Sequence, residues 1–78
     1  MSNRTQEQWS TYMKGLLKAE LTRRDISYQE LATLLHGIGV DDTPENLTNK
    51  INRGKFSAIF FVQCLDAIGC KLIRFGDD

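Results

Sequence analysis

The stretch TPENLTNKINRGKFSAIFF, residues 43–61, contains two helix starts and the glycine that separates them. Thr43 is a residue type that caps helices, and the proline after it fits the first helical position, where a missing N–H costs nothing. Gly54 can adopt the left-handed conformation that ends a helix, and the serine three positions later can cap the next one. We therefore predict a helix over residues 44–53 and a more apolar helix over residues 57–68.

Two further helix starts precede this stretch. Thr5 and Ser27 are each followed, three positions later, by a glutamine or a glutamate, which is the spacing of a capping box. Apolar residues then recur at intervals of three and four, so one side of each segment is hydrophobic. We predict helices over residues 6–24 and 27–36, which makes four helices in all.

The segment CKLIRF, residues 70–75, follows the last helix and is rich in strand-forming residues. We predict a short β-strand here. A lone strand leaves its backbone groups unpaired, so we expect the same segment of a second copy to pair with it antiparallel. The dimer interface would then consist of Leu72, Ile73 and Phe75. The alternative is an extended tail that packs on the first helix of its own chain.

The size and composition of the chain limit what it can be. Its 78 residues are enough for one domain, and 41% hydrophobic with 26% charged residues is typical of a globular protein. The formal net charge is zero, so the strongly basic balance of many nucleic-acid-binding domains is absent. The sequence shows neither a run of roughly 20 apolar residues, which would span a bilayer, nor a signal peptide. We therefore expect a cytoplasmic protein without a membrane partner.

The predicted helix over residues 44–53 has two unlike sides. At about 100° per residue, Leu47 and Ile51 fall together and should face the core. The side chains that point elsewhere are mainly amides and cations, among them Asn46, Asn49, Lys50 and Arg53. Asparagine can pair with the edge of adenine and arginine with that of guanine, and a helix of this length fits the major groove of DNA. The simpler interpretation is that any small surface helix is polar on its outer side.

Several short motifs occur in a characteristic order along the chain. They are Ile26-Ser27, Glu30-Leu31-Ala32, Arg53-Gly54-Lys55 and Ala67-Ile68-Gly69. In their order and setting, over residues 16–75, the chain resembles the lambda-repressor-like helix-turn-helix family, often called the XRE family. It is also similar to a group of small bacterial proteins that are known only as a domain of unknown function.

The resemblance implies a compact all-α domain, in which four helices include a helix-turn-helix and precede the short C-terminal β-strand. It also implies a homodimeric transcriptional regulator that binds double-stranded DNA and places residues 44–53 in the major groove. The DNA-binding residues would be Asn46, Asn49, Lys50, Arg53 and Lys55. Of these, Arg53 and Lys55 would contact phosphates, which attract cations.

A second interpretation keeps the helix-turn-helix scaffold but uses it for protein contact, without DNA binding. The zero net charge favours it, and so do Asp41, Asp42 and Glu45, which put negative charge where phosphates would lie. The turn before residue 44 is also longer than in the family, because HGIGVDDT replaces a tight turn. The asparagine-rich side of the helix favours DNA binding, and the sequence leaves both interpretations open.

The chain lacks the usual signs of an enzyme. His36 is its single histidine, and the sequence has no glycine-rich phosphate loop, nucleophile elbow or metal-ligand spacing. Cys64 and Cys70 are expected to be free thiols. Nothing in the sequence favours a catalytic pair of Cys64 and His36 over a core cysteine. We expect no catalytic activity, no cofactor and no metal.

Overall fold

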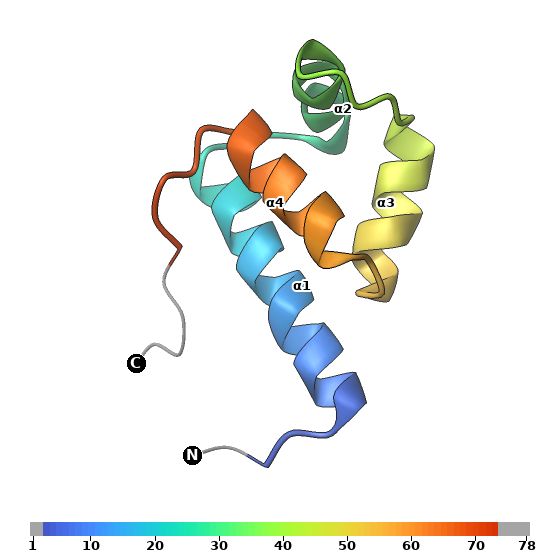
Figure 1. The fold of residues 1–78 in the computed structure, drawn as a ribbon, viewed down its shortest axis with the longest axis vertical. Coiled ribbons are helices and arrows are strands. Elements are labelled where there is room, and N and C mark those ends of the chain that lie inside the picture. The colour runs from blue at the N-terminus through green and yellow to red at the C-terminus, as the bar shows by residue number, and fades with distance from the viewer. Residues whose placement is uncertain (1–2, 74–78) are drawn as a thin grey trace.

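Figure 1 shows the four helices of the computed structural model, which describes residues 3–73 of the chain. The helices are α1 (Gln6–Arg23), α2 (Tyr28–Gly37), α3 (Pro44–Arg53) and α4 (Ala58–Ala67). α2 packs against both α3 and α4, and α1 packs against α3. In Figure 1, α4 crosses in front of α1, and the N-terminal half of α1 extends beyond the other helices. No helix in the described part of the chain is long and apolar enough to cross a membrane.

Each helix begins at a side chain that satisfies free N–H groups of the first turn. The hydroxyl oxygens of the four N-caps accept hydrogen bonds from the backbone N–H three positions later; these caps are Thr5, Ser27, Thr43 and Ser57. The caps of α1 and α2 are complete capping boxes, because the side chains of Gln8 and Glu30 bond back to the N-cap N–H groups. Local sequence therefore sets where the helices begin.

The core draws on all four helices. Its buried side chains are Leu17, Leu21, Leu31, Leu35, Leu47, Ile51, Phe60, Cys64 and Ile68. Leu47 and Ile51, the two aliphatic residues predicted to anchor α3, have no exposed surface. Burying a leucine or isoleucine side chain stabilises a fold by about 1.5–3 kcal/mol, so this pair fixes which side of α3 faces outward.

Gly54 makes a close contact between the end of α3 and α1. Its φ of +68° is left-handed, a conformation that ends helices and that residues with a side chain rarely adopt. A Cβ added at this position would lie 3.1 Å from the carbonyl oxygen of Ser10 in α1. Glycine is therefore required here for two reasons, the backbone angle and the available space.

The predicted β-strand over residues 70–75 is wrong. Residues 70–73, the part that the structure describes, form no strand, and Phe75 lies outside the described residues. The N–H of Cys70 instead donates a hydrogen bond to the carbonyl oxygen of Leu65 over 2.9 Å, which closes the C-terminal end of α4. Apart from their end turns, the helices of the described chain bond their backbone groups internally, so they offer no sheet edge. Strand-forming side chains alone could therefore not make a strand.

Candidate functional site

α3 carries most of the residues that the sequence analysis singled out for DNA contact. Four of those five side chains line one shallow polar groove of about 270 Å³ together with Asp42, and they are Asn46, Asn49, Lys50 and Arg53. Lys55 is not part of this groove and lies at an exposed position directly after Gly54. The structure thus brings most of the predicted residues onto one surface, which we call the α3 groove.

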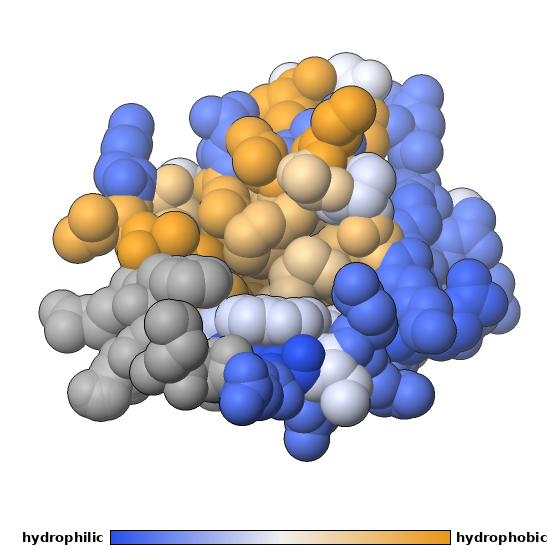
Figure 2. Space-filling view, turned by 60° about the horizontal axis from the view of Figure 1, so that its bottom comes forward, coloured by the Kyte–Doolittle hydropathy of each residue, from blue (hydrophilic) through white to orange (hydrophobic). Residues whose placement is uncertain are grey.

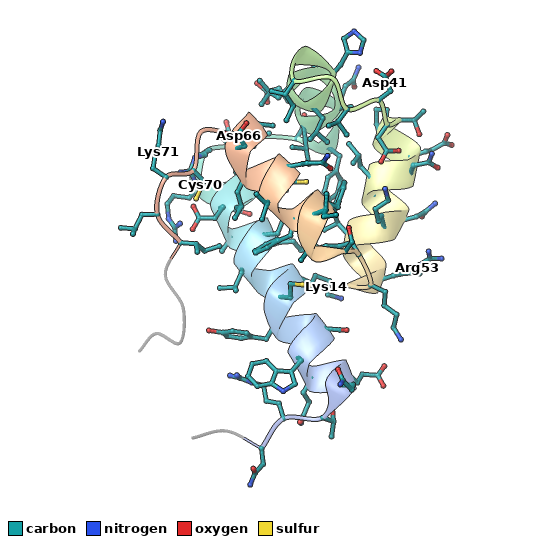
Figure 3. The ribbon with its side chains drawn as sticks, in the orientation of Figure 1. Lys14, Asp41, Arg53, Asp66, Cys70 and Lys71 are labelled. Atoms are coloured by element: carbon teal, nitrogen blue, oxygen red, sulfur yellow. The ribbon has the colours of Figure 1, made fainter. Side chains whose placement is uncertain are left out.

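The α3 groove faces outward because Leu47 and Ile51 hold the other side of α3 in the core. Asn49 lies almost opposite these two residues on the helix. The side chains of Asn46, Asn49 and Arg53 are exposed. Figure 3 shows Arg53 at the C-terminal end of α3, pointing away from the helix bundle. The amide of Asn49 and the guanidinium group of Arg53 are thus available to a ligand that approaches along α3, while the amide of Asn46 also bonds to Asp42.

Lys50 is held at the edge of the α3 groove by an ion pair. Its Nζ lies 2.9 Å from Oδ2 of Asp42, and the two side chains are 37% and 10% exposed. The same ammonium group lies 4.4 Å from the centre of the Phe60 ring, within the range of a cation–π contact. Lys50 therefore joins the turn, α3 and α4, and much of its charge is balanced before any ligand binds.

Asp42 places a negative charge in the α3 groove. Burial alone would raise the pKa of this carboxyl, but the hydrogen bond and the charge of Lys50 outweigh burial, with help from Asn46 and the N–H of Thr43. The pKa of Asp42 therefore lies below its ordinary value, and the carboxylate is ionised at neutral pH. The sequence did not reveal this pair, because the two residues are eight positions apart and meet where the turn folds back on α3.

The long turn between α2 and α3 has a contact of its own. Nδ1 of His36 and Oδ1 of Asp41 are 2.6 Å apart, and both side chains are largely exposed.

Cys64 lies in the core, away from this exposed turn, and burial raises the pKa of its thiol to about 12. The structure therefore does not join Cys64 and His36 as a reactive pair. Among residues 3–73, no group of three His, Cys, Asp or Glu side chains is placed to hold a metal ion.

The remaining cations near the ends of α1 and α3 differ in their surroundings. Arg23 and Arg24 both pair with the carboxylate of Glu20, whose side chain is only 7% exposed. Within residues 3–73, Arg53 and Lys55 form no ion pair with a carboxylate. Arg23 and Arg24 thus hold a buried carboxylate, whereas Arg53 and Lys55 keep their charge available to phosphate groups.

Two of the three residues predicted for a dimer interface, Leu72 and Ile73, lie in the described part of the chain. Leu72 is 83% exposed and Ile73 is half-buried, while Phe75 lies beyond the residues that the structure describes. Because residues 70–73 form no strand, the described chain does not show the antiparallel pairing that was predicted to bring Leu72 and Ile73 to a second copy.

A comparison with protein families matches residues 9–73 to DUF6471, a domain of unknown function. The match covers all four helices apart from the start of α1. Comparisons with curated proteins and with solved structures gave no match. The predicted similarity to proteins known only as a domain of unknown function is thereby confirmed, and the family description assigns no activity. The chain belongs to the DUF6471 family.

Proposed function

We propose that the protein binds double-stranded DNA in a sequence-specific way and acts as a small transcriptional regulator, with α3 in the major groove. The observation that carries this proposal is the α3 groove, where Asn46, Asn49 and Arg53 present amide and guanidinium groups on one exposed surface. Asparagine can make two hydrogen bonds to adenine, and arginine can make two to guanine. The order of motifs that resembles XRE-type helix-turn-helix proteins supports the same function.

Phosphate contacts would come from the end of α3. Lys55 is exposed, and within residues 3–73 it forms no ion pair, so its charge remains available. Because the domain has no net charge, one copy offers few phosphate contacts. The proposal therefore includes a homodimer, which doubles these contacts and reads two half-sites.

Fluorescence polarisation with labelled duplex DNA tests this proposal. A pool of random duplexes is first selected for binding, and the affinities for the selected site and for random DNA are then measured at low and moderate salt. Asn49→Ala should weaken binding to the selected site by about 1–3 kcal/mol and should change binding to random DNA little.

Asn52→Ala is the matched control. It removes the same side chain from the same helix, but Asn52 does not line the α3 groove, so this variant should bind as the parent does. If the parent binds no duplex at low salt, the proposed function is wrong. If Asn49→Ala and Asn52→Ala behave alike, α3 does not read DNA through this groove.

A protein-interaction module without DNA binding is the second candidate function. Asp42 favours it, because an ionised carboxylate in the α3 groove repels phosphate and balances the charge of Lys50. Asp41 and Glu45 add exposed negative charge near the N-terminal end of α3. Under the DNA-binding proposal, Asp42→Asn should leave DNA binding intact or strengthen it. Absence of binding to any duplex by both the parent and Asp42→Asn would favour the second candidate.

A further inference from the structure

α4 has an apolar face that the rest of the domain leaves uncovered. Ile59 is 71% exposed and Val62 is 60% exposed, and with Ala58 and Gln63 they line a shallow, almost wholly apolar groove of about 350 Å³. Single exposed apolar residues are common on protein surfaces, but Ile59 and Val62 are three positions apart and therefore neighbours on one helix face. Hydrophobic side chains also gather on the face of the molecule shown in Figure 2.

The opposite side of α4 already serves the core. Phe60 is 6% exposed and Cys64 is fully buried, and both pack with the other helices. On the helix, Val62 points nearly opposite to Cys64. α4 is therefore apolar on two sides, of which the four-helix core uses one.

The charges at the two ends of this face are unusual for an isolated helix. Asp66 is exposed, continues the row of Ile59 and Val62, and lies in the last turn of α4, as Figure 3 shows. A carboxylate is disfavoured there, because the helix dipole is negative at its C-terminal end, and this turn contains no cation. Lys55 stands at the other end, two positions before the N-cap. Within residues 3–73, neither Asp66 nor Lys55 forms an ion pair.

We propose that this face of α4 binds the same face of a second copy of the chain, with the two helices antiparallel about a two-fold axis. Such an interface maps the apolar groove onto itself, so the axis passes through its centre, between Ile59 and Val62. Ile59 then packs against the partner's Val62, and this contact occurs twice.

The charge pattern is the reason for choosing a second copy as the partner. An antiparallel arrangement places Asp66 beside the N-terminal end of the partner's α4, where the helix dipole is positive and the partner's Lys55 lies close by. The carboxylate of Asp66 thus interacts unfavourably with the dipole of its own helix but favourably with the dipole of the partner's helix. An apolar centre with a cation at one end and an anion at the other is complementary to itself when it is reversed.

The small area of this face limits the affinity of the dimer. A helix of ten residues is about 15 Å long, so the contact lies at the small end of specific interfaces. We expect a reversible dimer with a Kd of about 1–100 µM. This assignment names the surface of the homodimer in the proposed function, but it does not require DNA, since the α3 groove and the α4 face are formed by different residues.

Sedimentation equilibrium of the full chain over a range of concentrations tests the proposal in the absence of DNA. The average mass should rise from 8.9 kDa toward about twice that value. The double variant Ile59→Glu with Val62→Glu should remain monomeric, and its circular dichroism should match the parent because both positions are exposed. Leu72→Glu, which places one negative charge at an exposed apolar residue outside α4, should dimerise as the parent does.

The orientation is tested by two further measurements. Asp66→Lys should raise the Kd by about fivefold or more, because it reverses the contact with the partner's helix end. In a Cys70→Ser background with mild oxidant, a mixture of Ile59→Cys and Val62→Cys proteins should form mixed disulfides in preference to either homodimeric disulfide, since only that pair is within bonding distance.

Three results would overturn the proposal: a parent that stays monomeric at its highest soluble concentration, a double glutamate variant that dimerises like the parent, or homodimeric disulfides formed as readily as mixed ones. None of them bears on the α3 groove. Equally, an Asn49→Ala protein that loses its DNA site should still dimerise, so failure of the dimer and failure of DNA binding are distinguishable.

Discussion

The ammonium group of Lys14 donates a hydrogen bond to the backbone carbonyl oxygen of Asn52, with 2.9 Å between Nζ and the oxygen. Asn52 lies in the last turn of α3, where carbonyl groups lack partners within the helix and form the negative end of its dipole. Figure 3 shows Lys14 reaching from α1 toward this end of α3. The contact joins positions 38 residues apart and helps to orient the helix that we propose reads DNA.

Lys14→Met should remove this hydrogen bond and keep most of the side-chain length. We expect the free energy of unfolding to fall by about 1–2 kcal/mol, because a helix-terminal carbonyl loses a charged donor. Urea unfolding followed by circular dichroism measures the change. Lys18→Met, the same substitution elsewhere on α1, should change the free energy by less than about 0.5 kcal/mol. Equal losses in the two variants would contradict the role given to Lys14.

Gly54→Ala and Gly15→Ala should have opposite effects on stability. At Gly54 the left-handed φ and the carbonyl oxygen of Ser10, 3.1 Å from an added Cβ, should make alanine destabilising by about 1–3 kcal/mol. At Gly15, inside α1, an added Cβ meets no atom within 4 Å, so alanine should stabilise the helix by about 0.5–1 kcal/mol. Thermal and urea unfolding of both variants measure this. If both variants were stabilised, or both destabilised, the close contact between Gly54 and α1 would be contradicted.

Glu20 should make the free energy of unfolding depend on pH, with lower stability in acid. Hydrogen bonds from Arg23 and then from Arg24 hold the pKa of this carboxyl below its ordinary value, against the opposing effect of burial. The unfolded chain therefore binds this proton at a higher pH than the folded one. The stabilisation is complete above the unfolded pKa and is lost as the pH falls through the folded pKa.

The melting temperature should therefore fall as the pH is lowered from about 7 to about 3, and the fall should be smaller for Glu20→Gln. Glutamine at this position does not titrate, although it weakens the pairs with the two arginines at neutral pH. Thermal unfolding at a series of pH values measures the difference. Glu7→Gln, in the exposed first turn of α1, is the control and should keep the pH dependence of the parent. Parallel profiles for the parent and Glu20→Gln would rule out this role.

The two free cysteines should differ in their reactivity. The thiolate is the reactive form, and burial both shields Cys64 and raises its pKa to about 12, whereas Cys70 is half-buried. With an aromatic disulfide reagent at a pH of about 8, we expect one thiol to react in the native protein and two in urea. Cys70→Ser should remove the native reaction. Rapid reaction of both thiols without denaturant would be inconsistent with the core packing of Cys64.

Lys55→Ala should weaken DNA binding without changing its specificity. A phosphate contact is independent of base sequence, so affinity for the selected site and for random DNA should fall by the same factor. Both affinities are measured well above the dimer Kd, so that loss of the contact between Lys55 and the partner's Asp66 does not limit binding. The slope of log affinity against log salt concentration should decrease by about one. Lys71→Ala removes the same charge from an exposed lysine on the side of the molecule opposite Arg53 in Figure 3, and it should leave the slope unchanged. A slope unaffected by Lys55→Ala would remove this residue from the interface.

The positions of the helices and the buried side of α3 were predictable without the structure. N-caps act within one turn, so Thr43 and Gly54 mark the start and end of α3 without help from the rest of the chain. Leu47 and Ile51 needed burial wherever α3 was placed, because the periodicity of a helix puts both on one side. These features depend on residues close together in sequence, and local physics is enough to predict them.

Which side chains remain available and which find partners depends on the packing of distant parts of the chain. Lys50 was predicted to contact DNA, but the fold brings Asp42 and the Phe60 ring to its ammonium group. The strand expected over residues 70–75 depended on a neighbouring strand, which the described part of the fold does not supply. α4 is apolar on both sides, yet a four-helix domain of this size covers only one of them, because a small core has too little surface to enclose a whole helix. The type of a residue indicates whether its side chain needs burial, a charged partner or a neighbouring strand. The packing of distant segments determines whether the fold supplies it.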